Sequence, residues 1–180
     1  LDEAPLPTIY LRLWSNGVDG CAAGAIEIWD LTGGTAGAPA LDCTEVRVTL
    51  GKALAQGERA TLSMRLRITL PRRSDRFGYS GGLALVGTAL PTLEVHDDQG
   101  WHHDAFEDLG ESFYSVMGRY RVTLVGAPDL DTPATGTLVG APVLLPNGLV
   151  ARTYAATDVR DFAWAAGRLE QVSGGTAPKV

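Results

Sequence analysis

Arg59-Ala-Thr-Leu-Ser-Met-Arg-Leu-Arg-Ile-Thr-Leu70 is the stretch of this sequence that decides the fold. Apolar residues occupy every even position from Ala60 to Leu70, and polar or charged residues occupy every odd position. Strict alternation is typical of a β-strand with one buried face, because successive side chains of a strand point to opposite sides. At about 3.3 Å per residue, a strand over the whole stretch would reach roughly 40 Å. Such a strand needs neighbouring strands and an apolar layer against its even face.

Shorter alternating runs provide candidate neighbours, separated by glycine- and proline-rich turns. They lie at residues 8–14, 25–31, 45–50, 119–125, 149–157 and 160–165. The sequence therefore predicts an all-β fold, an antiparallel β-saddle or β-sandwich with at most one or two short helical turns, one of them within residues 112–117. We expect the strands at 45–50 and 59–70 to be antiparallel neighbours. Residues 32–40 and 71–82 are expected to be loops.

Composition excludes several classes of partner. The chain has 180 residues, of which 45% are hydrophobic and 20% charged, and this is typical of a single globular domain over residues 1–180. The net charge of −6 argues against a nucleic-acid or anionic-membrane partner, because both require clustered positive charge. No apolar run approaches the roughly 20 residues that span a bilayer.

Cys21 and Cys43 are the two cysteines, at the rims of a loop rich in glycine, alanine and proline. Either they form a disulfide, which would contribute about 3 kcal/mol to stability, or they are two unrelated buried thiols. A disulfide would predict a secreted or cell-envelope protein, and free thiols a cytoplasmic one. No signal-peptide pattern is present, so we expect an intracellular chain or one already trimmed. Two cysteines alone cannot provide a tetrahedral structural zinc site.

The sequence contains no His-Glu-x-x-His, Gly-x-Ser-x-Gly or Walker motif. One cluster of metal-binding residue types surrounds a turn, and a small metal-dependent hydrolase would have to use it: His96, Asp97, Asp98, His102, His103 and Asp104. Adjacent His102 and His103 would point to opposite sides of a strand, so we favour surface polar residues beside a buried Trp101. We expect no catalytic residue, metal ligand or cofactor in this chain.

Five segments, taken in order, resemble one protein family. They are residues 10–17 (Tyr-Leu-Arg-Leu-Trp-Ser-Asn-Gly), 90–101 (Leu-Pro-Thr-Leu-Glu-Val-His-Asp-Asp-Gln-Gly-Trp), 110–115 (Gly-Glu-Ser-Phe-Tyr-Ser), 120–124 (Tyr-Arg-Val-Thr-Leu) and 159–164 (Val-Arg-Asp-Phe-Ala-Trp). Together they resemble the N-terminal domain of M1-family zinc metallopeptidases, the aminopeptidase-N-like gluzincins, and especially of actinobacterial members.

The resemblance implies a β-saddle that packs against a thermolysin-like catalytic domain and walls one side of its cleft. The family's zinc helix, downstream glutamate ligand and Gly-x-Met-x-Asn substrate strand all follow the segment that matches residues 159–164. The sequence ends at Val180 without these motifs. We therefore expect a non-catalytic domain whose partners are a peptidase catalytic domain in cis and the peptide substrate of the parent protein, with zinc held only by the catalytic domain.

The resemblance also implies one substrate-binding residue and one exposed strand edge. In the family, a loop just before the Pro-x-Leu segment places a polar side chain, usually Gln or Asn, near the amino terminus of the substrate. The matching residues are 81–89, and their polar side chain is Thr88. Family members carry a β-hairpin before the strand that in this sequence runs from Thr8 to Trp14. Without it we expect an unpaired edge that pairs with a second copy in a homodimer.

A second function is a stand-alone extracytoplasmic β-sandwich module that binds peptide or carbohydrate. A concave row of exposed aromatic side chains would favour it, because such side chains are the usual anchors of these ligands. The candidates are Trp14, Trp29 and Trp101.

Overall fold

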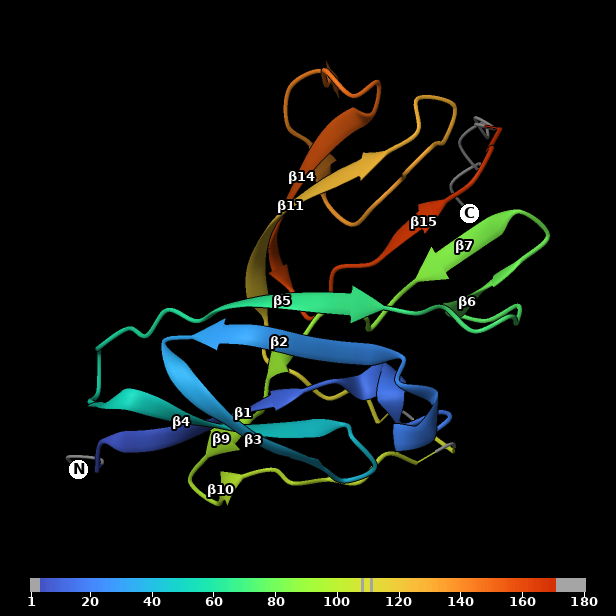
Figure 1. Cartoon of the computed structure of the whole chain (residues 1–180). Coiled ribbons are helices and arrows are strands. Elements are labelled where there is room, and N and C mark those ends of the chain that lie inside the picture. The colour runs from blue at the N-terminus through green and yellow to red at the C-terminus, as the bar shows by residue number, and fades with distance from the viewer. Residues whose placement is uncertain (1–3, 108, 111, 171–180) are drawn as a thin grey trace, which may run out of the picture.

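The chain is all β, as its alternating sequence predicts. The computed structural model describes residues 4–107, 109–110 and 112–170, and its strands pair antiparallel in several small sheets (Figure 1). Within these ranges the helical elements are two 3-10 turns, η1 (Trp14–Asn16) and η2 (Cys21–Ala23). No helix in the described ranges is long and apolar enough to cross a membrane. The predicted fold class is confirmed.

Two layers form the first half of the molecule (Figure 1). The lower layer is a sheet with the strand order β3 (Gly34–Ala40), β4 (Glu45–Leu54), β1 (Leu6–Arg12) and β8 (Thr92–Leu93). The upper layer pairs β2 (Ile26–Thr32) with β5 (Ser63–Ile68). A short hairpin of β9 (His96–Asp97) and β10 (Gly100–Trp101) lies below the lower sheet.

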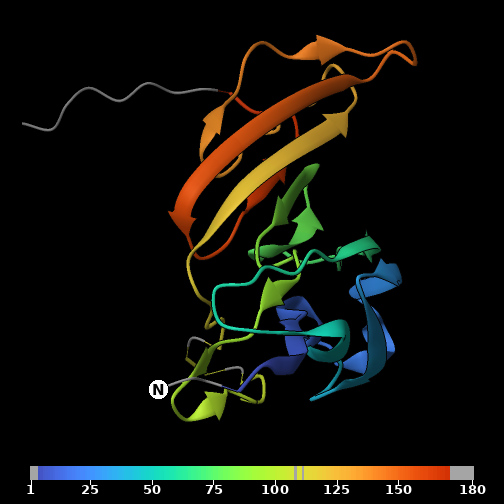
Figure 2. The same cartoon turned by 90° about the vertical axis from the view of Figure 1, so that its left-hand side faces the viewer.

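The second half of the molecule consists of two further sheets. One has the order β15 (Trp164–Ala166), β7 (Leu83–Val86) and β6 (Phe77–Ser80). The other is a long ribbon of β11 (Gly118–Gly126) and β14 (Val150–Val159), with β12 (Thr137–Leu138) and β13 (Val143–Leu144) also paired to β14. Figure 2 shows this ribbon at the end of the molecule opposite β9 and β10.

An apolar layer between β1–β4 and β2–β5 is the main core of the first half. Along β5, Met64, Leu66 and Ile68 are half-buried, whereas the alternating polar residues are exposed. The predicted alternation of faces therefore holds. We call the following set the central apolar layer: buried Leu11, Leu13, Ile26, Val46 and Val48, with half-buried Ile9, Ile28, Leu31, Leu62 and Met64.

The predicted strand at residues 59–70 is shorter in the structure, where β5 covers Ser63–Ile68. Its ladder with β2 begins at the pair Thr32–Ser63, and the next residue of the partner, Gly33, turns away with a φ of 87°. Residues 59–62 therefore have no strand to pair with. At the other end, the Thr69 N–H donates to the Ala25 carbonyl at 2.8 Å before Pro71 ends the run.

The prediction that the strands at 45–50 and 59–70 are neighbours is wrong. β4 pairs with β1 and β3, and β5 pairs with β2. Residues 55–62 carry the chain from the lower layer to the upper one. The two strands therefore face each other across the core, where their apolar sides meet, and are not hydrogen-bonded neighbours in one sheet.

Two predicted loops contain strands. Residues 32–40 include β3, in which Gly34 packs so close to β4 that a Cβ atom would lie 2.7 Å from the Thr49 carbonyl oxygen. Pro39 follows a register shift in the pairing, where a missing N–H is tolerated. Residues 71–82 contain β6, which pairs with β7. Conversely, residues 112–117 form no helical turn.

The expectation of an unpaired edge on the strand from Thr8 to Trp14 is also wrong for its second half. β1 lies between β4 and β8, with Leu11 opposite Leu93 and Arg12 opposite Thr92. The Tyr10 carbonyl also accepts the Glu94 N–H at 2.9 Å. The sheet therefore supplies the neighbour that the expected homodimer would have provided there.

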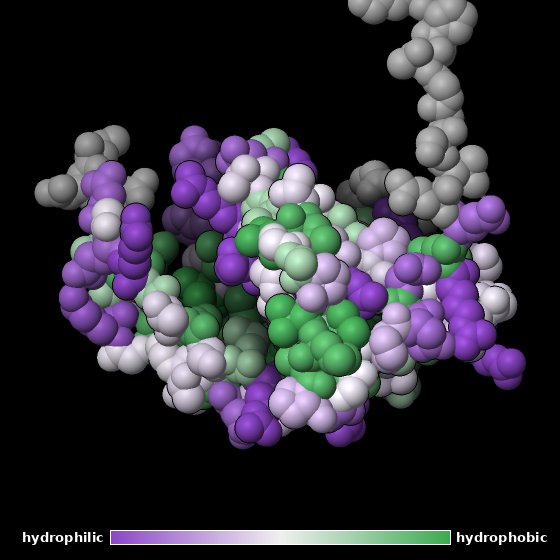
Figure 3. Space-filling model, turned by 90° about the horizontal axis from the view of Figure 1, so that it is seen from above, coloured by the Kyte–Doolittle hydropathy of each residue, from purple (hydrophilic) through white to green (hydrophobic). Residues whose placement is uncertain are grey.

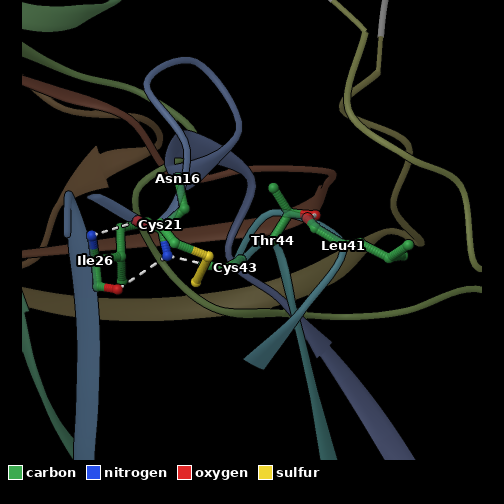
Figure 4. Close-up of a disulfide and its surroundings, with 6 residues drawn as sticks. All are labelled: Asn16, Cys21, Ile26, Leu41, Cys43 and Thr44. Atoms are coloured by element: carbon green, nitrogen blue, oxygen red, sulfur yellow. Dashed lines mark hydrogen bonds between the residues drawn. A yellow bond between two sulfur atoms is a disulfide. The ribbon is translucent and has the colours of Figure 1, made fainter. Parts of the chain in front are cut away.

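A disulfide and a buried amide join the ends of three strands (Figure 4). Cys21 and Cys43 form the disulfide, with their Cα atoms 5.1 Å apart. Beside it, the Asn16 side chain accepts the Ile26 N–H at 2.7 Å and donates to the carbonyls of Ile26 at 3.0 Å and Cys43 at 2.9 Å. Asn16 is only 3% exposed, so these bonds satisfy backbone groups that have little access to water.

Replacing one inward and one outward residue of β5 with the same small polar side chain tests the assignment of its faces. We expect Met64→Ser to lower the free energy of unfolding by about 2 kcal/mol, because its side chain packs on the central apolar layer. Arg65→Ser should change it by less than about 0.5 kcal/mol, because its contact with Asp30 is solvent-exposed. Urea unfolding measures both. Equal losses, or a larger loss for Arg65→Ser, would contradict an inward Met64 and an outward Arg65.

Removing the disulfide should destabilise the chain without changing its fold. The Cys21→Ser, Cys43→Ser double variant is expected to lose about 3 kcal/mol, because the unfolded chain regains the entropy of a loop with a sequence separation of 22. The unmodified chain with reductant is the matched control and should lose a similar amount. A loss below about 0.5 kcal/mol in both would show that the covalent link contributes nothing.

Candidate functional site

Thr88 lies in the turn between β7 and β8, with a φ of 52° that is rare for a β-branched residue. Its hydroxyl donates to the Gly87 carbonyl at 2.7 Å and lies 3.1 Å from Ser15 Oγ. Ser15 Oγ also donates to the Thr88 carbonyl at 3.0 Å. These contacts fix both the backbone and the side chain of Thr88.

Asp161 holds the same turn from the other side. Its Oδ2 accepts the Thr88 N–H at 2.7 Å, and its Oδ1 accepts the N–H of buried Phe162 at 2.8 Å. Ser15 and Asp161 belong to two of the five segments that carry the family resemblance, residues 10–17 and 159–164. The fold therefore brings these segments together at Thr88, an arrangement that no sequence spacing indicated.

A hollow of about 150 Å³ opens beside Thr88. Its walls combine aromatic rings with both signs of charge, and the Arg76 guanidinium lies 5.0 Å from the Phe113 ring centroid. Among the described residues no histidine or cysteine lines it. The lining residues of most interest are Ser15, Arg73, Asp75, Arg76, Thr88 and Glu107.

A second polar centre surrounds the side chain of Arg12, the last residue of β1 in the lower sheet. This arginine is 0% exposed, and its guanidinium donates to Glu94 Oε1 at 2.9 Å and to the Asp104 carbonyl at 2.6 Å. It also lies 3.8 Å from Glu45 Oε2 and 3.8 Å from the Trp14 ring centroid. One guanidinium thus faces two buried carboxylates.

His103 completes this centre. Its Nδ1 lies 2.6 Å from Glu45 Oε2 and 3.5 Å from Glu94 Oε2. Burial raises the pKa of Glu94 to about 7, assisted by the neighbouring Glu45 carboxylate and opposed by Arg12. We refer to Arg12, Glu45, Glu94 and His103 as the buried charge cluster.

The histidine cluster suggested by the sequence does not converge on one point. His102 Nε2 lies 2.7 Å from Asp97 Oδ2 near the surface, whereas His103 points to Glu45. His96 packs against Trp101, with ring centroids 4.7 Å apart. The sequence contained the residues of the buried charge cluster but no signal for it, because they lie 33, 49 and 9 positions apart along the chain.

The three candidate tryptophans, out of four in the sequence, do not form a shared platform. Trp14 is buried under Arg12. Trp29 is 39% exposed on β2, with the Arg67 guanidinium 5.8 Å from its ring centroid. Trp101 is half-buried in the β9–β10 hairpin beside Tyr10. This arrangement gives no support to a stand-alone carbohydrate-binding module.

Comparison with solved structures gives a likeness of fold. No protein-family model matches the chain, and no curated protein matches it. A crystal structure of a mutant two-domain M1 zinc metallopeptidase bound to L-arginine aligns with 92% of this chain, with a TM-score of 0.54 and 15% sequence identity. The likeness covers 35% of that protein's chain. At this identity the two share a fold, and the chain corresponds to about a third of the longer protein.

Replacing Arg12, the cation of the buried charge cluster, should lower the free energy of unfolding. Replacing the anion Glu94 as well should restore part of that free energy. We expect Arg12→Met to lower the free energy of unfolding by about 3–5 kcal/mol, because two buried carboxylates lose their partner. Adding Glu94→Gln should recover a large part of this loss, since only one buried charge then stays uncompensated. Denaturant unfolding of both single variants and the double variant measures the coupling. Strictly additive losses would contradict the pairing of Arg12 with Glu94.

Proposed function

We propose that this chain is the non-catalytic N-terminal domain of an M1-like zinc metallopeptidase, of the type found in actinobacteria. In this proposal it packs as a single domain against the catalytic domain and forms one wall of the substrate cleft. The observation that carries the proposal is the likeness of fold, which extends over nearly the whole chain but over only a third of a two-domain metallopeptidase. The ordered sequence segments point independently to the same family.

The turn at Thr88 supports a role in holding the amino terminus of a peptide. Its hydroxyl hydrogen is directed to the Gly87 carbonyl, which leaves a lone pair to accept a hydrogen bond from a substrate ammonium group. Asp75 and Glu107 line the same hollow and could pair with an ammonium group, but Arg73 and Arg76 line it too, so the charge of these four side chains gives no net preference for a cation. Asp161 and Ser15 fix the turn, so this contact would be made without reordering the loop.

The surface also offers apolar area for a neighbouring domain. Seen from the β11–β14 end, apolar residues gather in the middle of the molecule (Figure 3). Val125 and Val143 flank Ala151 in adjacent strands of this sheet, and both are at least half exposed. Exposed apolar area of this kind is typical of docking surfaces. The disulfide supports a secreted or cell-envelope location for the parent protein.

The role of Thr88 is tested in the protein encoded by the complete reading frame, which we expect to continue into a His-Glu-x-x-His motif. Thr88→Ala should raise the KM for an aminoacyl p-nitroanilide about 3- to 10-fold, the effect of one hydrogen bond, with kcat nearly unchanged. Ser80→Ala, in an exposed position of β6, is the control and should leave both constants unchanged.

Two results would contradict the proposed domain assignment, and a third would contradict the role of Thr88. The first is a complete reading frame without a zinc-binding helix. The second is peptide hydrolysis by residues 1–180 alone. The third is a Thr88→Ala enzyme whose KM equals that of the unmodified enzyme, which would remove Thr88 from the substrate site while leaving the domain assignment open to the first two tests.

A further inference from the structure

Three metal-binding side chains converge in the buried charge cluster from separate parts of the chain. Glu45 begins β4, Glu94 lies between β8 and β9, and His103 follows β10. One ligand atom from each lies within 4.8 Å of the others. Because both glutamates are buried and are fixed by backbone pairing close to them, their convergence is built into the fold and is not a chance meeting of surface side chains.

Glu94 supplies an independent sign of a missing ligand. The residue is 2% exposed, and its Oε2 has no hydrogen-bond partner among the described residues. The other oxygen, Oε1, already accepts from Arg12. A buried carboxylate oxygen without a donor is costly, and this one lies 3.5 Å from His103 Nδ1 on the side where Glu45 Oε2 also lies.

The charges of the cluster do not balance. When His103 is neutral, as it must be to bind a metal, Glu45 and Glu94 bring two negative charges against the single positive charge of Arg12, in a place largely shielded from water. A second cation would balance them.

We propose that Glu45 Oε2, Glu94 Oε2 and His103 Nδ1 bind one divalent transition-metal cation, with Zn²⁺ as the best-matched ion. Carboxylate oxygen and imidazole nitrogen are both zinc ligands. Ligand atoms around a tetrahedral Zn²⁺ are about 3.4 Å apart, given bonds of about 2.1 Å. The two distances from His103 Nδ1, 2.6 and 3.5 Å, lie on either side of this value, and all three ligand atoms lie within 4.8 Å of one another.

The surroundings suit a metal site with three protein ligands and one open position. The His103 side chain is 44% exposed, which gives the ion access and leaves a fourth position for water. Arg12 holds Glu94 by the oxygen that does not face the site, and the Tyr10 ring packs edge-on against the His103 ring at 4.5 Å. Such outer contacts orient metal ligands. The cation would tie β4 to the segments around β9 and β10, and this inference is independent of the proposed peptidase role.

The test is zinc binding by residues 1–180 after removal of metal with a chelator. Calorimetric titration with Zn²⁺ should give one site per chain, and one equivalent should raise the thermal unfolding temperature. We expect His103→Ala and Glu94→Gln each to weaken binding at least 10-fold. His102→Ala removes the neighbouring imidazole, which contacts Asp97 instead, and should change the affinity less than about 2-fold. Cobalt absorption spectra of the unmodified chain and His103→Ala would report the loss of the nitrogen ligand.

Two outcomes would overturn the site. One is no binding to the unmodified chain at zinc concentrations up to about 0.1 mM, which would mean that a proton alone neutralises the cluster. The other is binding that survives His103→Ala and Glu94→Gln but is lost in His102→Ala, which would place the ion on the surface pair with Asp97. Since His103 is partly exposed, its alanine variant is expected to fold, and circular dichroism checks this before titration.

Discussion

The central apolar layer is the contact on which the rest of the structure depends. A two-stranded ribbon such as β2–β5 is only marginally stable alone, so it keeps its shape by burying the even side of β5 against β1 and β4. This contact sets the distance between the two layers. The disulfide and Asn16 then join the strand ends at one side, and Ser15, in the turn after β1, reaches the turn that carries Thr88. The candidate substrate contact is therefore positioned by the same layer.

Much of the fold could be predicted from alternation, because the face of a strand is a property of its own sequence. The sequence indicated which side chains of β5 are buried and which are exposed, as well as the strands β1, β11 and β14. It could not indicate which strand pairs with which. That choice depends on how residues 55–62 cross between the layers. An alternating sequence is expected both for a strand beside another in one sheet and for a strand in the facing layer, so alternation does not distinguish the two. The strand β3 was predicted as a loop, because the glycines and other small residues that allow close packing of strands are also typical of loops.

The two candidate sites also differ in how far the sequence could predict them. Thr88 could be singled out because it lies just before the segment at 90–101 that carries the resemblance, but the residues that hold it, Ser15 and Asp161, are 73 positions away on either side. The buried charge cluster is drawn from four places in the chain and contains no local pattern. Its meaning depends on burial and on the imbalance of charge, which only the folded chain reveals. The pair of His102 and Asp97 shows the converse, since the adjacent His102 and His103 reach different partners in the fold.

Native-state hydrogen exchange of residues 1–180 tests most directly whether the two layers form one cooperative core. We predict that amides of β1, β4 and β5 share the slowest exchange and respond together to added denaturant, because opening the central apolar layer exposes all three. Amides of residues 112–117, which lie outside the strands, should exchange much faster. If the β5 amides exchange as fast as those of residues 112–117 while β1 and β4 stay protected, the alternating strand does not close the core, and the central role of the apolar layer is contradicted.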